Sequence, residues 1–208
     1  MKQILILSAI AASLTFASAC SSAPETATTN RAAANTTANA ATTNTTTSAN
    51  AAPKTDNDAP AAIKAVFPDA QSFTTQHKDV PADKIASIEK DTSSKVPDKD
   101  HHSYLAFSTT GGARKQIGAA TIVKVDGKDV VIVYDNKDGS PVIKEIRADG
   151  VPAPFLKQFA GKGHEDDLLL GADIKASGAN EAQAKAITEA VRVDVLTMQA
   201  LYGAAHKH

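Results

Sequence analysis

The chain has 208 residues, a formal net charge of -1 at pH 7 and a sequence pI near 6.6. Aromatic residues make up only 4 % of it, and tryptophan is absent. A near-neutral chain without a basic tract gives no reason to expect nucleic-acid binding, and few aromatic rings are available to stack on bases. The single cysteine, Cys20, excludes an internal disulfide framework.

The first 19 residues have the features of an export signal. A positive charge at Lys2 precedes an apolar run over residues 4–14, which is too short to span a bilayer. Small residues at positions 17–19 lead directly to Cys20. This arrangement resembles the lipobox of bacterial lipoproteins, in which the cysteine becomes the acylated first residue, although Ala17 stands where leucine is usual. The alternative is an ordinary secretory signal that is cleaved after residue 19 and leaves a free thiol.

Acylation of Cys20 would anchor the exported protein to a membrane of the cell envelope. Ser21, rather than aspartate, follows the cysteine, which in a Gram-negative bacterium resembles the sorting signal for the outer membrane. Residues 20–60 comprise the lipid-bearing cysteine and a linker dominated by Ala, Thr, Asn and Ser. Because this linker lacks the large apolar side chains that offset the entropy of ordering, we expect it to be a disordered tether.

The folded part is predicted over residues 61–208, about 150 residues, which is enough for one domain with its own core. Two helices are predicted near its start, over residues 61–66 and 82–91. Apolar or β-branched runs then predict four strands, at residues 104–108, 117–125, 130–134 and 142–146. Asp126-Gly127 predicts a hairpin between the second and third of these strands. The expected fold class is α+β, with a largely antiparallel sheet packed with helices.

A long C-terminal helix completes the predicted domain. A short helix is expected over residues 152–158, and the final helix over residues 181–202. Four apolar side chains of the final helix recur at helical spacing and form one face: Ile187, Val191, Val195 and Met198. We expect this face to pack onto the sheet.

Several segments of the folded part, taken in order, resemble a known family. They are Val66-Phe67-Pro68, Gly118, residues 155–162, residues 166–174 and Ser177-Gly178-Ala179. Their order and spacing are similar to the FMN-binding domain family, which includes the extracytoplasmic flavin subunits of the Rnf and Nqr electron-transport complexes. The resemblance covers most of residues 61–202. It implies an FMN cofactor, a redox partner in the cell envelope, and an electron carrier rather than an enzyme that transforms a substrate.

The family attaches its flavin at the position that Asn180 occupies here. In the family the Ser-Gly-Ala tripeptide is followed by Thr or Ser, whose hydroxyl is joined to the FMN phosphate. Asn180 has no hydroxyl, and Ile174 stands where the family usually has an acidic residue, with Asp173 one position further away. The usual covalent link is therefore not expected. The resemblance still implies a site for non-covalent FMN at Ser177–Asn180, because the N–H groups and dipole of a helix N-terminus favour a phosphate.

Asn180 also has a role that follows from its own chemistry. Asparagine is among the preferred N-cap residues, and Gln183, three positions later, completes a pattern like the capping box. The two roles are compatible, since a capping Asn180 still has an amide group that can donate a hydrogen bond to a phosphate.

Two functions from different classes are therefore open. The first is an exported, lipid-anchored protein of the FMN-binding type that acts in extracytoplasmic electron transfer without covalent flavin. The second is a flavin-free binding or scaffold module on the same fold, which the change at Asn180 favours. Stoichiometric binding of FMN would separate them.

His101 and His102, close to Asp98 and Asp100, are a weaker candidate for a metal site. Adjacent histidines in a strand point to opposite faces, so joint ligation by both is awkward. A solvated loop ahead of the first strand is the favoured interpretation.

Two further polar groups carry little functional signal. The acidic run at residues 165–167 lacks the spacing of a calcium loop and is predicted to be solvated. His206 and His208, near the end of the sequence, are expected to bind metal only adventitiously. The sequence contains no recognisable arrangement of nucleophile, base and acid, so no catalytic residue is assigned.

Overall fold

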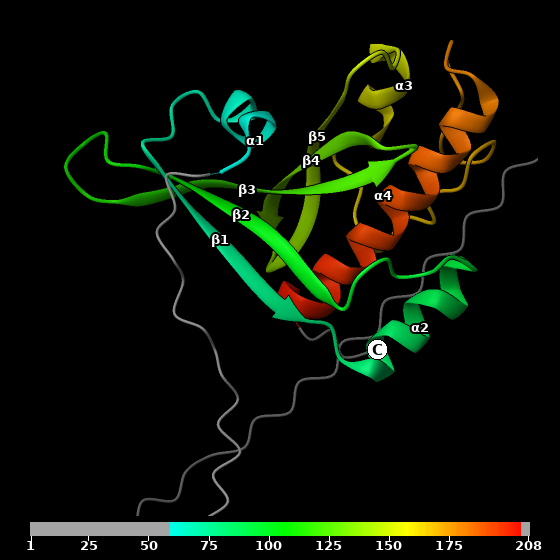
Figure 1. Cartoon of the computed structure of the whole chain (residues 1–208), viewed down its shortest axis with the longest axis horizontal. Coiled ribbons are helices and arrows are strands. Elements are labelled where there is room, and N and C mark those ends of the chain that lie inside the picture. The colour runs from blue at the N-terminus through cyan, green and yellow to red at the C-terminus, as the bar shows by residue number, and fades with distance from the viewer. Residues whose placement is uncertain (1–58, 205–208) are drawn as a thin grey trace, which may run out of the picture. The chain divides into compact units, whose positions relative to one another are not determined.

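The structure is a computed structural model and describes residues 59–204. The predicted export signal, Cys20 and the predicted linker up to residue 58 lie outside the described residues, as do His206 and His208. The described residues form a five-stranded antiparallel sheet with helices packed on both of its faces (Figure 1).

The sheet is a meander in which each strand pairs with the next one along the chain, in the order β1-β2-β3-β4-β5. The strands are β1 (Ser72–Asp79), β2 (Asp100–Ser108), β3 (Lys115–Val125), β4 (Lys128–Lys137) and β5 (Ser140–Ala148). The helices are α1 (Ala61–Val66), α2 (Ala82–Thr92), α3 (Ala153–Leu156) and α4 (Glu181–Tyr202), with a 3₁₀ turn, η1, at Lys157–Phe159. The α+β class, the antiparallel sheet and the long C-terminal helix are confirmed.

Two tight turns join β3 to β4 and β4 to β5. In each turn an aspartate and the following glycine have positive φ: 51° and 75° at Asp126 and Gly127, and 53° and 83° at Asp138 and Gly139. Two left-handed residues in succession are the requirement of a type I′ turn, whose twist matches that of the paired strands. The hairpin predicted at Asp126-Gly127 is confirmed.

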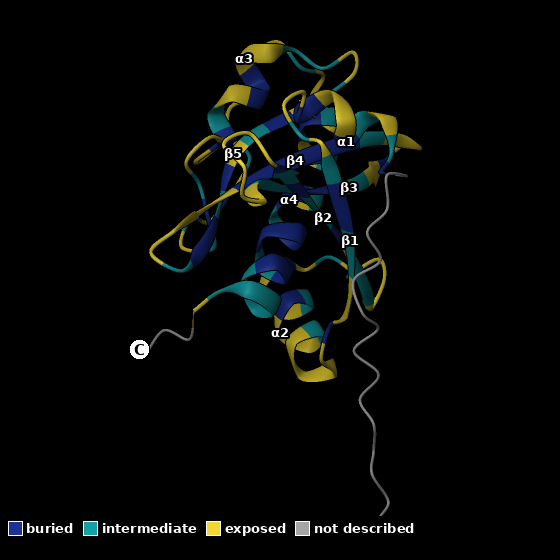
Figure 2. Ribbon diagram, turned by 90° about the vertical axis from the view of Figure 1, so that its left-hand side faces the viewer, coloured by how far each residue is buried: buried dark blue, intermediate teal, exposed yellow. Residues whose placement is uncertain are grey.

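Alternation of side chains along the strands gives the sheet two buried faces. On one face α3, η1 and α4 pack against the sheet, and α4 contributes the four apolar side chains that were predicted to face it. On the other face α1 and Phe67, the residue after it, pack against side chains of β1 to β4. Residues 130–134 of β4 are all buried, because successive side chains point into the two cores (Figure 2).

Phe67 and Gly118, both part of the family pattern, pack against each other in the second of these cores. A Cβ atom at Gly118 would lie only 2.4 Å from Cε1 of Phe67, so a larger residue would have to displace the ring. These two positions of the pattern therefore have a packing reason that does not depend on any ligand.

β1 was not predicted, and β2 begins at Asp100 rather than at residue 104. The C-terminal half of β1 and the first residues of β2 are polar, so they lack the apolar alternation that predicts a strand. The end of β1 is exposed, whereas the start of β2 is mostly half-buried and includes the buried Ser103. They are strands because their backbones pair with each other over the whole length of β1. His101 and His102 consequently lie in β2, and their prediction as part of a solvated loop was wrong.

α2 and the segment after it lie beside α4 (Figure 1). α2 ends where Ser93 takes a left-handed conformation, with φ of 55°. Residues 94–98 then lead back to β2 and line one side of a pocket against α4. None of the helices within residues 59–204 has the length and apolar character needed to cross a membrane.

Candidate functional site

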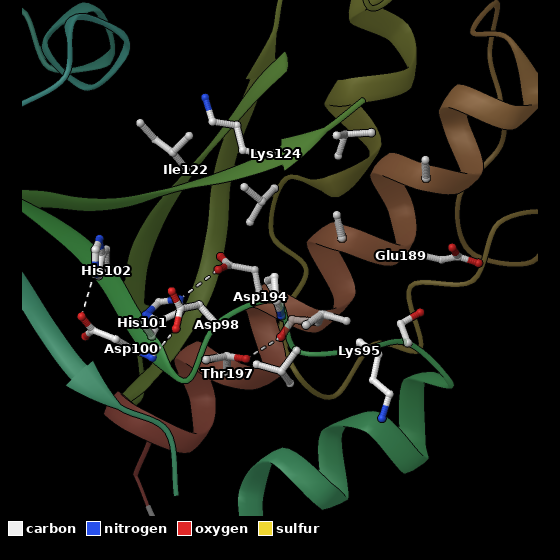
Figure 3. A pocket seen from close by; sticks show the side chains of 18 of the residues that line it. Lys95, Asp98, Asp100, His101, His102, Ile122, Lys124, Glu189, Asp194 and Thr197 are labelled. Carbon is white, nitrogen blue, oxygen red and sulfur yellow. Dashed lines mark hydrogen bonds and ion pairs between the residues drawn. The ribbon is translucent and has the colours of Figure 1, made fainter. Parts of the chain in front are cut away.

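A buried carboxylate, Asp194 on α4, joins this helix to three strands of the sheet. Only 5 % of the Asp194 side chain is exposed. Its Oδ2 accepts hydrogen bonds from Oγ1 of Thr121 on β3 and from the phenol of Tyr134 on β4, each at 2.6 Å. Its Oδ1 lies 3.0 Å from Nε2 of His101 on β2 (Figure 3). These contacts compensate a charge that would otherwise be costly to bury.

The same contacts fix the proton on the ring of His101. An ionised carboxylate only accepts hydrogen bonds, so Nε2 of His101 donates to Asp194. The second ring nitrogen, Nδ1, is buried and has no hydrogen-bond partner within residues 59–204. Buried polar atoms are nearly always satisfied in folded proteins, so this enclosed Nδ1 is an exception within the network around Asp194.

The phenol of Tyr134 stays protonated and donates its hydrogen bond to Asp194. Burial raises the pKa of Tyr134 well above 10, and the negative charge of Asp194 raises it further. The phenol is therefore neutral at all physiological pH values, and its proton stays directed at the carboxylate.

A pocket of about 560 Å³ lies beside this network, between α4, β3 and the segment after α2 (Figure 3). His101 and Asp194 are part of its lining. Apolar side chains from all three elements form much of its wall, namely Val96, Pro97, Val123, Val125, Ala186, Ala190 and Val193. The volume and the mixture of apolar walls with a few polar groups are typical of a small-molecule site.

The charged side chains of the pocket are mostly acidic. Its lining contains five carboxylates and two lysines: Asp98, Asp100, Asp126, Glu189 and Asp194, with Lys95 and Lys124. Both lysines already pair with carboxylates that do not line the pocket, since Nζ of Lys95 lies 2.6 Å from Oε2 of Glu89 and Lys124 bonds to Asp129. Among the carboxylates, Glu189 lies 3.9 Å from Nζ of Lys185, and Asp100 contacts His77 and His102. The surplus of negative charge in the pocket therefore comes mainly from Asp98 and Asp126.

The residues predicted to bind flavin, Ser177–Asn180, lie in the loop that leads into α4. Asn180 is the N-cap of α4, as predicted, and its Oδ1 accepts hydrogen bonds from the N–H groups of Ala182 at 3.0 Å and Gln183 at 3.4 Å. The return bond from the Gln183 side chain that would complete a capping box is not formed within the described residues. The cap thus occupies two of the N–H groups that a phosphate at this helix terminus would use.

The other members of this loop are partly engaged as well. Oγ of Ser177 accepts a hydrogen bond from Nε2 of Gln158 at 3.0 Å, and the N–H of Ala179 donates to the carbonyl of Ala176 at 2.9 Å. Gly178 has a φ of 88°, a conformation that favours glycine. None of residues 177–180 lines the pocket beside Asp194.

The two adjacent histidines point to opposite faces of β2, as the alternation of a strand predicts. His101 contacts Asp194 on the α4 side of the sheet, whereas Nε2 of His102 lies 3.0 Å from Oδ2 of Asp100. The same oxygen of Asp100 lies 3.2 Å from Nδ1 of His77 on β1. The hydrogen bond from His102 is the main cause that lowers the pKa of Asp100, and the bond from His77 lowers it further. Oδ1 of Asp98 accepts the backbone N–H of Asp100 at 3.0 Å.

The acidic run at residues 165–167 is tied into its own loop. Its central residue, Asp166, bonds to Nζ of Lys162 at 3.2 Å and to the N–H of Gly163 at 2.9 Å. These contacts use both oxygens of the Asp166 carboxylate within the loop.

Asp194 was not identified from the sequence, although its position carries a signal. It lies three residues after Val191 and four before Met198, so helical spacing places a carboxylate on the apolar face of the final helix. Its partners Thr121 and Tyr134 lie in separate strands far earlier in the chain, and no local pattern connects them with it.

Comparison of the chain with protein-family models, with curated proteins and with solved structures gives no match. The resemblance to the FMN-binding domain family therefore remains a prediction from the residues quoted for it.

Proposed function

We propose that the domain is a ligand-binding module whose pocket beside Asp194 takes an organic cation with an apolar body. The observation that carries the proposal is the pocket itself, which combines apolar walls with a surplus of carboxylates. With the predicted export signal and the predicted lipid on Cys20, the whole chain would be a binding protein tethered in the cell envelope.

The chemistry of the lining defines the class of ligand. An ammonium or guanidinium group is attracted by carboxylates such as Asp98 and Glu189, and an alkyl or aromatic body covers apolar residues such as Val123 and Val193. An N–H donor on the ligand therefore suits the carboxylates of this lining.

The same charges disfavour an anion in the pocket. FMN carries a phosphate with a charge of roughly -1.5 to -2 at pH 7, as phosphate monoesters do. Neither lysine of the lining is free to neutralise it, because each already pairs with a carboxylate. On electrostatic grounds the flavin-free binding module is the better supported of the two functions considered for this chain.

An FMN-dependent electron carrier is the second candidate, and one observation favours it. The N–H groups of Asn180 and Glu181 donate no hydrogen bond to an acceptor within residues 59–204, and they lie at the N-terminus of the 22-residue helix α4. Free N–H groups at such a terminus favour phosphate binding. In this alternative FMN binds without a covalent link and passes electrons to a redox protein of the envelope.

Two probes with one apolar body and opposite charges test the first proposal. We would titrate the full chain with 4-phenylbutylamine and with 4-phenylbutyrate, and follow backbone amide shifts by NMR. The amine is expected to shift residues 94–100, 122–126 and 186–197, whereas the acid leaves them unchanged. Equal binding of both probes, or amine-induced shifts confined to other residues, would contradict the proposal.

A matched pair of variants on one helix sharpens this test. Glu189→Gln removes a carboxylate of the pocket, and Glu181→Gln removes one at the N-terminus of α4, outside the pocket. Only Glu189→Gln is expected to weaken binding of the amine, by roughly two- to fivefold for one partly exposed charge.

A titration with FMN decides between the two candidate functions. The electron-carrier alternative requires stoichiometric FMN binding at micromolar concentration that Glu189→Gln leaves unchanged. Flavin absorbance that leaves the protein on denaturation would support this alternative and count against the first proposal. Flavin fluorescence that persists in a denaturing gel would show a covalent link and overturn our interpretation of Asn180.

A further inference from the structure

The outer face of the β1–β2 pair carries two histidines and two aspartates close together. In the register of the two strands His77 lies directly opposite His102, and Asp79 lies opposite Asp100. Because alternate residues of a strand share a face, all four belong to the same face of the sheet. Lys78, between His77 and Asp79, points to the other face and contacts the end of α4.

Three of these side chains already bring their ligand atoms together. Oδ2 of Asp100 lies 3.0 Å from Nε2 of His102 and 3.2 Å from Nδ1 of His77 (Figure 3 shows the contact with His102). The three atoms all lie within 4.8 Å of one another. In a tetrahedral zinc site, bonds of about 2.0–2.2 Å hold neighbouring ligand atoms roughly 3.3–3.6 Å apart. The present separations of these atoms are thus close to those that a bound ion requires.

We propose that His77, Asp100 and His102 bind a divalent transition-metal ion, with Zn²⁺ as the representative ion. Two imidazoles and a carboxylate are donors that suit zinc and its neighbours in the first transition row, whereas calcium and magnesium prefer oxygen ligands alone. Asp79, opposite Asp100 in the strand register, adds a second negative charge to this face of the strand pair.

The surroundings of the three ligands suit reversible binding. Their side chains are about half exposed, at 53 % for His77, 42 % for Asp100 and 46 % for His102. An ion therefore reaches them from solvent without any movement of the core, and water completes its coordination. The strand pair fixes the ligands, because the backbone ladder of β1 and β2 runs through all of them.

This proposal does not rest on the organic ligand proposed for the pocket. Asp100 and His102 also contribute to the lining of that pocket, so metal and amine could influence each other there. The metal titration is therefore made without any organic probe, and its result can fail or succeed independently of the binding-module proposal.

The experiment is a calorimetric titration of the full chain with Zn²⁺, in a background that carries His206→Ala and His208→Ala to remove the C-terminal histidines. His77→Ala and His102→Ala are the test variants. His164→Ala, which removes a histidine outside the cluster, is the matched control. Titration with Co²⁺ gives a second readout, since its visible absorption depends on the ligands and their geometry.

We expect one Zn²⁺ per chain in the background and in His164→Ala. Loss of an outer partner of a metal ligand already weakens affinity by 10- to 100-fold, so each test variant is expected to lose at least roughly tenfold. Zn²⁺ should also raise the Tm of the background but not of the test variants. A cooperative thermal transition of each test variant without metal checks that it remains folded. Absence of binding, or affinity unchanged by both His77→Ala and His102→Ala, would overturn the proposal.

Discussion

The phenol of Tyr134 on β4 donates a hydrogen bond of 2.6 Å to the carboxylate of Asp194 on α4, across the interface between the sheet and the helix. Thr121 and His101 bring β3 and β2 to the same carboxylate. A single acidic side chain thereby connects the C-terminal helix with three successive strands. The same side chain lines the pocket, so the stability of the fold and the shape of the candidate site depend on one network.

Replacing Asp194 tests the importance of this network for stability. Asp194→Ala leaves the buried donors of Thr121, Tyr134 and His101 without their acceptor, and one unsatisfied buried group costs about 1–3 kcal/mol. We expect the free energy of unfolding, measured by urea denaturation, to fall by about 3–5 kcal/mol. Glu189→Ala, at an exposed position of the same helix, is the control and should change it by less than about 0.5 kcal/mol. Similar losses in both variants would contradict the prediction.

The stability of the protein should fall as the pH rises above about 10. Burial raises the pKa of Tyr134 well above this value, and burial also raises the pKa values of Tyr104 and Tyr202, the other two tyrosines of the chain. Below pH 10 the folded and unfolded states both keep these protons, so the full stability is present. Above it the unfolded chain releases them first, and stability is lost as the pH approaches the folded-state pKa values.

Urea denaturation at a series of alkaline pH values measures this loss, and the absorbance of tyrosinate in the folded protein reports the ionisation directly. Tyr134→Phe removes the most strongly shifted group, and should make the free energy of unfolding less dependent on pH in this range. Ionisation of all three tyrosines of the folded chain with a midpoint near 10 would show that the phenols are not protected.

The N-cap of α4 should contribute measurably to stability. Asn180→Ala removes the acceptor of two N–H groups, and the free energy of unfolding is expected to fall by about 1 kcal/mol. Asn180→Asp and Asn180→Thr keep a capping oxygen and should cost less than the alanine variant. Thermal unfolding of the three variants provides the measurement. Equal losses in all of them would mean that the side-chain oxygen of Asn180 does not act as the cap.

Gly118 should tolerate no side chain while Phe67 is present. The Cβ of Gly118→Ala would lie 2.4 Å from the ring, so we expect a loss of about 1–3 kcal/mol in the free energy of unfolding. The double variant Gly118→Ala with Phe67→Leu should be more stable than the sum of the two single changes predicts. Strict additivity in this urea-denaturation cycle would show that the ring is not the cause.

Sequence patterns predicted the structure correctly where the residues of a segment themselves determine its conformation. α4 has the predicted limits because apolar residues recur along it and Asn180 caps its start. The turn at Asp126-Gly127 forms because its backbone conformation is set by the two turn residues and the adjoining strands. β1 was not predicted, because its C-terminal half is polar and exposed. This segment is a strand because its backbone pairs with that of β2.

The candidate sites depend on contacts between distant parts of the chain. His77 meets Asp100 and His102 only through the register of β1 and β2, and the spacing of these residues in the sequence gives no metal-binding motif. The interpretation of the two adjacent histidines as a loop failed for the same reason. Their opposite orientation was predicted correctly, since it follows from the geometry of any strand.

By itself the sequence determined the α+β class, the final helix with its cap, one hairpin and the absence of a hydroxyl at Asn180, because each of these depends on a residue and its near neighbours. Tertiary structure alone decided that Asp194 is buried among a histidine and two hydroxyls, and that a pocket with an acidic lining opens beside it. The burial of a charge is set by which partners the fold brings to it. Those partners come from three strands that lie far from the helix in the sequence.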